Sequence, residues 1–406
     1  MAENRPRANS NTKSHNMFRI SRLQEVMKGL PRDRFERVVS EHQADKHSKG
    51  FGSWDQLIAM VYAQLAGASG LRDLVTGFNR QHVHHYHLGT GELRRSTLAD
   101  ANGKRAPEVF AEVARRLMAQ VQRRERRAGE QLLYALDSSA ITLAGHQFED
   151  WTQANRTRHI QGVKLHVAYA AHEQAPSWAS ITAPNVNDVT EGTRVPLQAG
   201  ATYVFDKGYY DYGWWHQIDQ AKATFVTRFK RNAKLKVLGQ RRVPRAAAVL
   251  VLRDQIVRFA NPTPRGGHRN PYTKPLRRIV VARPQHDTPL VLATNDLRSS
   301  ALTIARRYQD RWQIELFFKW IKQHLKIKRF FGRSENAVRI QILTALITYL
   351  LLALYRRAHG LKVTLWALLG ELRVTLFQRP TLEAEWWRRR QEQRAQFALL
   401  QPALFA

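Results

Sequence analysis

The chain has 406 residues, enough for two or three domains with separate hydrophobic cores. Apolar residues make up 43% of it, which excludes a wholly disordered polymer. Its 65 Lys and Arg against 33 Asp and Glu give a formal net charge of +32, and such a field attracts polyanions, usually nucleic acid. A ribosomal-type or membrane-surface protein is the alternative, but the basic residues are spread through segments of folded composition. The absence of cysteine excludes disulfides and thiolate metal sites.

The first part of the chain is predicted to be helical. Residues 1–16 are polar and basic, so we expect a disordered basic tail there. Apolar residues then recur every three or four positions in SWDQLIAMVYAQLAG and APEVFAEVARRLMAQVQRR, with Ser53 placed as an N-cap. Residues 17–128 are predicted to form an all-α DNA-binding domain of helix-turn-helix type. A plain helical bundle would show the same pattern.

A histidine cluster interrupts this region in the segment HVHHYH, which contains His82, His84, His85 and His87. Such clusters invite a metal-binding interpretation. The spacings match no familiar zinc pattern, so a solvated or phosphate-contacting loop is favoured.

The pattern changes to short β-rich segments over residues 129–230. Three segments separated by turn-length gaps are followed by a polar helical stretch and then by alternating strand, helix and strand. This order is typical of the first part of a ribonuclease-H-like α/β core. The predicted strands and helices are Gln131–Ser139, Gly162–Ala171, Ser177–Pro184, Val189–Leu197, Thr202–Gly208, 212–222 and 223–230.

Residues 231–283 are basic and strand-like, with interspersed Pro and Gly, and are predicted to form a β-strand insertion into that core. Residues 284–360 are assigned to the second part of the core. They include one more strand, a helix from Tyr308 to Phe331, and the apolar run Ile340–Tyr355. That run is short for a bilayer span and carries polar residues, so we expect a buried core helix. Residues 361–406 are assigned to a C-terminal helical region.

Two aspartates end predicted strands, Asp137 in LDSS and Asp206 in VFDKGYYD. Either one alone has an ordinary explanation, because Asp commonly starts turns and caps helices. In a ribonuclease-H-like sheet, however, the first and fourth strands are neighbours, so the two carboxylates would meet. Two such carboxylates repel, and a divalent cation is the usual solution. A third oxygen ligand is then expected from a nearby helix.

The helix predicted from Tyr308 to Phe331 supplies a candidate. At about 100° per residue, Tyr308, Arg311, Glu315 and Lys322 fall within a sector of about 60°, while most of the remaining circumference is apolar. A solvated face with a salt bridge between Arg311 and Glu315 is the alternative, since they are four residues apart. Bulky apolar groups on so much of the helix instead favour a buried helix whose charged side faces other charges.

The spacing Tyr308-x2-Arg311-x3-Glu315-x6-Lys322 resembles the Y-(2)-R-(3)-E-(6)-K signature of bacterial insertion-sequence transposases of the IS-four family. The segments around Asp137 and Asp206 are similar to the regions of that family's first and second catalytic Asp. The similarity runs from about Phe35 to Arg357 and includes SWDQLIAMVYAQLAGASGLRDL and RRSTLADAN, which resemble the N-terminal domain of one branch. The basic segment before Glu315 matches the insertion that such enzymes carry.

The resemblance implies that Asp137, Asp206 and Glu315 are catalytic and hold two divalent ions, physiologically Mg²⁺, for which Mn²⁺ can substitute. It implies that Tyr308, Arg311 and Lys322 grip DNA phosphates. Trp312 matches an aromatic residue that lies near a displaced base in related enzymes, although it could equally belong to the core. The implied site residues are therefore Asp137, Asp206, Glu315, Tyr308, Arg311, Lys322 and Trp312.

The implied function is cut-and-paste DNA transposition, in which the enzyme binds the terminal inverted repeats of double-stranded DNA, cleaves them and joins them to target DNA. The implied partners are that DNA and a second copy in a homodimeric paired-end complex, without a membrane, in the bacterial cytoplasm at the nucleoid. Some relatives excise through a DNA hairpin with a Trp in the insertion, but residues 231–283 contain no Trp. A catalytically silent DNA-binding descendant and a metal-dependent nuclease are the alternatives.

Overall fold

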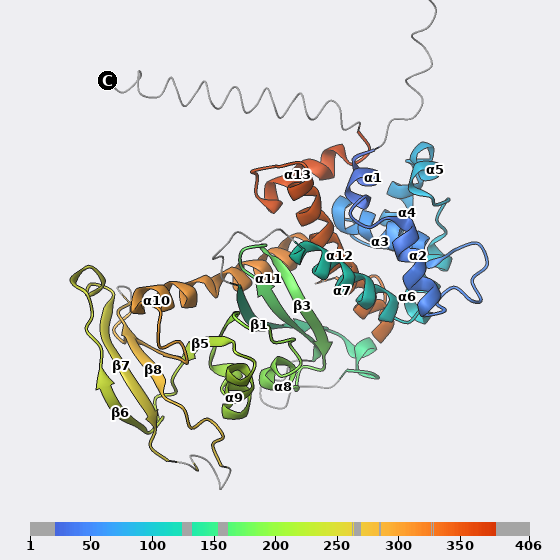
Figure 1. Ribbon diagram of the computed structural model, residues 1–406. Helices are drawn as coiled ribbons and strands as arrows, with labels where there is room; N and C mark the ends of the chain where they lie inside the picture. The colour runs from blue at the N-terminus through green and yellow to red at the C-terminus, as the bar shows by residue number, and fades with distance from the viewer. Residues whose placement is uncertain are drawn as a thin grey trace, which may run out of the picture.

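The computed structural model is an α/β molecule in which helices cover both faces of one mixed sheet (Figure 1). It describes residues 21–123, 132–152, 161–261, 263, 269–283, 286–325, 327 and 329–378. The predicted tail at residues 1–16 and the end of the C-terminal region from residue 379 lie outside the described residues.

The central sheet has nine strands in the order β3-β2-β1-β4-β5-β9-β8-β7-β6. Strands β1, β2 and β3 pair antiparallel, while β4 and β5 run parallel to β1. This arrangement of five strands is consistent with the ribonuclease-H-like fold that the sequence predicts. The strands are β1 (Leu133–Thr142), β2 (Gly162–Ala170), β3 (Ala175–Thr182), β4 (Thr202–Phe205), β5 (Thr224–Arg228), β6 (Leu235–Gln240), β7 (Val251–Phe259), β8 (Leu276–Val281) and β9 (Leu290–Thr294).

One face of the sheet is covered by α8 (Asp188–Gly192) and α9 (Tyr212–Gln220). Trp214 and Trp215 of α9 are fully buried there, in an aromatic core with residues of β1, β4 and β5. Burying two such large side chains contributes several kcal/mol, at roughly 25 cal/mol per Å² of apolar area. The strand ends above α9 are therefore fixed by packing and by the sheet ladder together.

The opposite face carries the segment predicted as one helix from Tyr308 to Phe331, and that prediction was wrong in its bounds. The structure has two consecutive helices, α10 (Ala301–Asp310) and α11 (Trp312–His324), with Arg311 between them. Figure 1 shows them following one another across the sheet. Ser300 starts the first helix because its hydroxyl accepts a hydrogen bond from the Thr303 amide at 3.0 Å.

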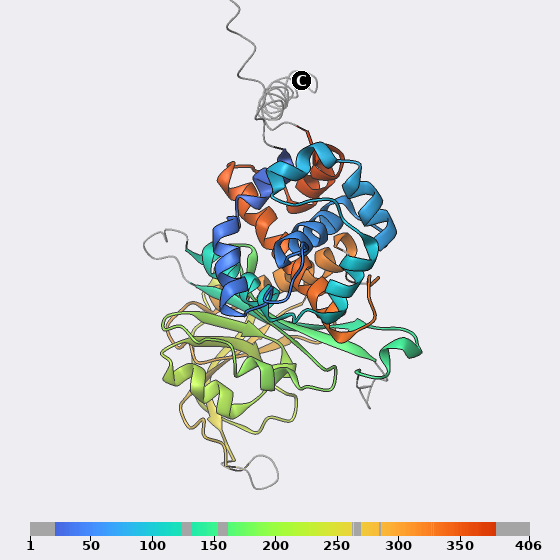
Figure 2. The ribbon, with the colours of Figure 1, turned by 90° about the vertical axis from the view of Figure 1, so that its right-hand side faces the viewer.

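The N-terminal region is helical, as predicted. Its helices pack together with α12 and α13 above one end of the sheet (Figure 2). They are α1 (Arg22–Met27), α2 (Arg32–Glu41), α3 (Ser53–Ala66), α4 (Leu71–Asn79), η1 (His82–His84), α5 (His85–Leu88), α6 (Arg95–Lys104) and α7 (Glu108–Gln122). The short helices η2 (His146–Phe148), η3 (Lys207–Tyr209) and η4 (Arg245–Ala247) belong to connections of the α/β part.

The histidine cluster forms the short helices η1 and α5. His85 is buried, stacks on Phe78 and lies with Nε2 3.0 Å from the Phe78 carbonyl oxygen. Within the described part of the chain, no group of three or more His, Cys, Asp or Glu side chains is placed to hold a metal ion. The cluster therefore includes a packed core histidine, and the metal interpretation finds no support.

Helix α12 (Glu335–Ala358) joins the helical region to the sheet, and α13 (Leu365–Thr375) follows it. Among the described residues, α12 is the one helix long and apolar enough to span a bilayer by composition, but 94% of its apolar window is buried inside the protein. One core cluster contains its residues together with those of the N-terminal helices, α11 and β1 to β3. The helix is therefore placed as a core helix, as predicted.

The predicted β-insertion extends the sheet. Strands β6, β7 and β8 pair antiparallel, and β9 pairs with both β8 and β5. Inside this part, Arg277 and Asp254 are 1% and 3% exposed and form two hydrogen bonds of 2.7 and 2.6 Å. A guanidinium buried so deeply depends on its carboxylate partner for charge compensation.

We predict that Asp254→Ala lowers the free energy of unfolding by about 3–5 kcal/mol, because it leaves the Arg277 charge buried without its carboxylate. Urea unfolding measures the change. The double variant Asp254→Leu with Arg277→Met removes both charges and is expected to recover most of the loss. Equal losses in the single and double variants would contradict this account.

Candidate active site

The register between β1 and β4 brings Asp137 and Asp206 together, although the prediction that Asp137 ends its strand was wrong: β1 continues to Thr142 by pairing with β2, and only its ladder with β4 stops before Asp137. The parallel ladder runs from Leu133 opposite Thr202 to Leu136 opposite Phe205. Asp137 and Asp206 are the next residues on the two strands, so the ladder places them side by side. Asp206 also accepts a hydrogen bond from the Gly208 amide at 2.7 Å, so it caps the following turn as well. The turn role and the meeting of carboxylates are thus compatible.

The side chain of Arg311 lies between Asp137 and Glu315. One guanidinium nitrogen is 4.0 Å from Oδ2 of Asp137, and the other donates to Oε1 of Glu315 at 2.5 Å. The two carboxylates therefore lie at the two sides of one guanidinium. The structure therefore brings Asp137 and Asp206 together where the β1–β4 ladder ends, and the Arg311 guanidinium connects Asp137 with Glu315.

Burial and neighbouring charge raise the pKa of Asp137 to about 6. Burial is the largest cause, and the carboxylates of Asp206 and Glu315 raise the pKa further. The Ser138 amide, which donates to Asp137 at 2.8 Å, and the Arg311 charge oppose this increase. The negative charges are close enough to repel one another, and this repulsion favours binding of a cation.

The other residues of the predicted signature lie along α10 and α11. Tyr308 is 9% exposed and lies under the Arg311 guanidinium, 5.8 Å from ring centre to carbon. Lys322 donates to the Ser139 hydroxyl at 2.6 Å and to the Ala140 carbonyl at 2.9 Å, so it reaches β1 just beyond Asp137. Their phosphate contacts stay predictions.

Trp312 does not belong to the core, because its side chain is 58% exposed. Leu316, one turn further along α11, is 50% exposed, so the apolar part of this helix is not wholly buried. Ile314, Phe317 and Ile321 provide the packing. Exposed apolar side chains therefore border the site.

Sequence reasoning missed Asp188, the first residue of α8. Its Oδ1 accepts a hydrogen bond of 2.6 Å from the hydroxyl of Ser138, the neighbour of Asp137. Asp188 follows the N-cap Asn187 at the start of a short helix, which is an ordinary place for an aspartate. The one signal in the sequence was Ser138. Its side chain points to the sheet face opposite Asp137, and a partly buried hydroxyl needs a hydrogen-bond partner there.

The donor set suits a hard divalent cation, since it consists of carboxylate oxygens from adjoining elements. As they stand, the described residues hold no group of three or more His, Cys, Asp or Glu side chains placed to bind a metal ion. The three carboxylates fit such an ion in chemistry and charge, and the guanidinium of Arg311 between Asp137 and Glu315 offsets part of their negative charge.

A mixed sheet that brings two aspartates together near a helix glutamate is compatible with the carboxylate-based phosphoryl-transfer enzymes. The chain belongs to the DDE transposases: the family described as "Transposase DDE domain" matches residues 128–351, more than half of the chain. A second family, described as a domain of unknown function (DUF4372), matches residues 19–91. The protein is thus a transposase of an insertion-sequence element and an enzyme that acts on DNA, and the IS-four resemblance is confirmed.

The relatives are transposases by name. The chain is 42% identical to y4zB, named as a transposase of Sinorhizobium fredii, over 71% of this chain and 78% of that one. It is 29% identical to a transposase for IS5377 of Geobacillus stearothermophilus (61% and 65%), and 26% identical to one for IS4SA of Synechocystis (64% and 71%). A piggyBac transposase synaptic complex with hairpin DNA aligns with a TM-score of 0.47 and 11% identity, over 88% of this chain and 80% of that one.

The raised pKa of Asp137 predicts how stability depends on pH. Because the folded state favours the protonated carboxyl, its contribution is fully present below about pH 4 and is lost as the pH rises through about 6. In EDTA, Asp137→Asn is therefore expected to be more stable than the unmodified chain by roughly 2–3 kcal/mol at pH 8 and by only about 1 kcal/mol at pH 4.5. Urea unfolding at the two pH values measures this. Asp287→Asn, at an exposed aspartate, is the control, and a similar gain in both variants would contradict the assignment.

Proposed function

We propose that this transposase binds the terminal inverted repeats of its element and catalyses metal-dependent strand cleavage and strand transfer, a cut-and-paste reaction. The observation that supports this most directly is the pairing of β1 with β4, which brings Asp137 and Asp206 side by side. Arg311 lies between Asp137 and Glu315. The alternatives are a catalytically silent DNA-binding descendant and a metal-dependent nuclease. Both would share the fold but would differ in the reaction that they catalyse at the transposon ends.

In this proposal Asp137, Asp206 and Glu315 hold two Mg²⁺ ions, for which Mn²⁺ can substitute. Such ions activate the attacking oxygen and stabilise the leaving oxygen of an in-line displacement at phosphorus. DNA transposases of this family generally use divalent metal ions. The residues would contribute oxygen ligands; burial is the main cause of the raised pKa of Asp137, and the charges of Asp206 and Glu315 raise it further, so a cation would stabilise the ionised carboxylates.

The basic residues bind DNA in this proposal. The Arg311 guanidinium donates a hydrogen bond to the Glu315 carboxylate. A DNA phosphate presents its oxygens in a similar arrangement, so it would compete with Glu315 for this guanidinium. Lys322 would add a point charge near the end of β1. The exposed ring of Trp312 supplies an apolar surface for a base next to the reacting phosphate. Tyr308 would support the Arg311 guanidinium from below.

We predict that Asp137→Ala, Asp206→Ala and Glu315→Ala each lower cleavage of a labelled transposon-end duplex by at least 1,000-fold in Mg²⁺, an order of magnitude typical for loss of an essential catalytic group. Binding of the same duplex in EDTA should remain within about threefold, because the carboxylates do not attract phosphate. Asp287→Ala, at an exposed aspartate on the turn before β9, is the matched control. Undiminished cleavage by any of the three variants would remove that residue from the site.

The same assay separates the rival functions. Binding without cleavage by the unmodified chain would support the silent DNA-binding descendant. Nicking without joining to target DNA would support the nuclease. Joined products that require all three carboxylates would support the transposase proposal. The excision route proposed here does not invoke a hairpin, since Tyr272 of the insertion is buried and Phe259 packs edge-on against Tyr212, with ring centres 4.6 Å apart.

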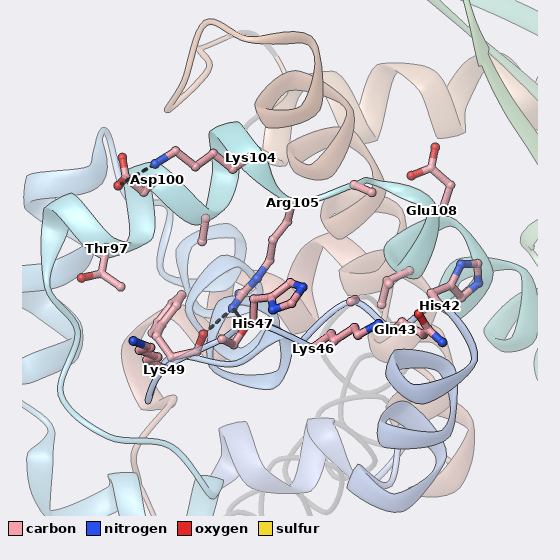
Figure 3. Close-up of a pocket in the computed structure, with 16 residues that line it drawn as sticks. His42, Gln43, Lys46, His47, Lys49, Thr97, Asp100, Lys104, Arg105 and Glu108 are labelled. Carbon is pink, nitrogen blue, oxygen red and sulfur yellow. Dashed lines mark hydrogen bonds and ion pairs between the residues drawn. The ribbon is translucent and has the colours of Figure 1, made fainter.

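We also propose that the helical region at residues 17–128 binds the end DNA. A cleft of about 730 Å³ lies there between the loop before α3 and helix α6 (Figure 3). Arg105 fixes the loop by donating to the Gly52 carbonyl at 2.8 Å and lying 3.5 Å from Asp45. Lys46 and Lys49 line the cleft and are exposed, and neither forms an ion pair with the described residues. They supply fixed positive charges for a phosphate backbone.

We predict that the double variant Lys46→Gln with Lys49→Gln weakens end binding and reduces the dependence of log affinity on log salt by about 2, or roughly 0.9 for each phosphate that is no longer neutralised. Fluorescence anisotropy over a salt series measures this. Lys28→Gln with Lys362→Gln, at exposed lysines outside the cleft, makes the same change in net charge and should leave the salt dependence unchanged. Equal effects of the two pairs would mean that only net charge matters.

The proposed assembly is a homodimer that holds two transposon ends, acting in the bacterial cytoplasm at the nucleoid. The net charge of +32 supports association with DNA there. Light scattering with and without end DNA tests the dimer, and a complex of one chain with one end would contradict it.

A further inference from the structure

Asp188 lies behind the strand that carries Asp137. Side chains alternate along β1, so Asp137 faces α11 while Ser138 faces the opposite side of the sheet, where α8 lies (Figure 1). There, the Ser138 hydroxyl donates to Oδ1 of Asp188 at 2.6 Å. The middle of β1 is therefore held on its far face through the residue next to Asp137.

Asp188 also contacts the turn after Asp206. A Cβ added at Gly208 would lie 3.1 Å from Oδ2 of Asp188 and 2.9 Å from Oδ1 of Asp206. Both carboxylates thus lie against the bare backbone of this glycine, whose amide donates to Asp206. One side chain, Asp188, touches the segments that position Asp137 and Asp206.

The Asp188 carboxylate is itself held by basic and polar groups. Lys164 of β2 lies 3.3 Å from its Oδ1 and donates to the Val186 carbonyl at 2.6 Å. His166 lies 3.7 Å from the same oxygen, and burial lowers the pKa of His166 to about 4, so this imidazole is neutral at pH 7. Lys164 is therefore the charged group that compensates Asp188 and fixes its orientation.

On the near face, the next serine is held in a similar way. Ser139 accepts a hydrogen bond from Lys322 of α11. The two serines after Asp137 are thus tied to opposite sides, Ser138 to Asp188 behind the sheet and Ser139 to Lys322 in front of it. These two hydrogen bonds restrain the position and the orientation of β1 around Asp137.

We propose that Asp188 is a positioning residue that, through Ser138 and the Gly208 turn, holds Asp137 and Asp206 at the separation required to bind divalent metal. Asp188 contacts the groups that orient the ligands, and outer partners of this kind typically account for about 10–100-fold in metal affinity. This inference rests on the proposed metal-dependent function. It adds a residue from α8, whereas the signature residues come from β1, β4, α10 and α11.

The test measures Mn²⁺ binding by calorimetry on the full chain, independently of activity. Asp188→Ala and Ser138→Ala are each expected to lower Mn²⁺ affinity by about tenfold or more, and the double variant is expected to be no weaker than Asp188→Ala, because both changes break one connection. End-DNA binding in EDTA should be unchanged in all three. The matched control is Asp219→Ala, which removes a carboxylate on the same face that pairs with Lys274 at 2.5 Å, and it should retain the Mn²⁺ affinity.

Three outcomes would decide the question. Unchanged Mn²⁺ affinity in Asp188→Ala and Ser138→Ala, together with cleavage by the unmodified chain, would overturn this inference and leave the proposed function intact. Losses that multiply in the double variant, or accompany an equal loss of DNA binding, would assign Asp188 to general stability and also overturn it. A chain that neither binds Mn²⁺ nor cleaves would overturn the proposed function, and this inference with it.

Discussion

The parallel pairing of β1 with β4 imposes the constraint on which the rest of the site depends. It forces two carboxylates into neighbouring positions where the ladder between the two strands ends, and there they repel each other in partly buried surroundings. The fold tolerates this because buried aromatic packing under α9 fixes both strands and because Arg311 adds a positive charge. The free energy stored in that repulsion becomes available when a cation binds.

Arg311, between α10 and α11, has a second role besides the proposed binding of DNA. Arg311 neutralises Glu315 and lies near Asp137, so the same side chain that would bind a phosphate also limits the negative charge of the site. DNA that draws the guanidinium away would expose the carboxylates to metal. By linkage, metal that captures Glu315 would release Arg311 for DNA. In the proposed mechanism, binding of substrate and binding of metal would therefore reinforce each other.

The sequence predicted the order of strands along the chain, because alternation and turn residues are local, and it predicted that Asp137 and Asp206 are neighbours. It wrongly ended the first strand near Asp137, because it could not show the pairing of β1 with β2 as far as Thr142. It could not predict the break at Arg311, since both sides of it have helical periodicity and the backbone there stays in the helical region. Asp188 was missed because its capping context is ordinary and its partner Ser138 is 50 residues away. The buried pair of Arg277 and Asp254 likewise depends on register, which a basic segment does not reveal.

The insertion has one further effect through its place in the sheet. Because β9 bonds to β5, and strand β8 of the insertion bonds in turn to β9, neither β5 nor β9 has an open edge on that side. An uncovered β5 would offer unpaired backbone groups to other chains, a common route to aggregation. The edge strand of the sheet on that side is instead β6, whose pairing with β7 is interrupted by a bulge and which carries Lys236. The insertion therefore also protects solubility, and a chain trimmed to the five-stranded core would forfeit this protection as well as any DNA surface that the insertion provides.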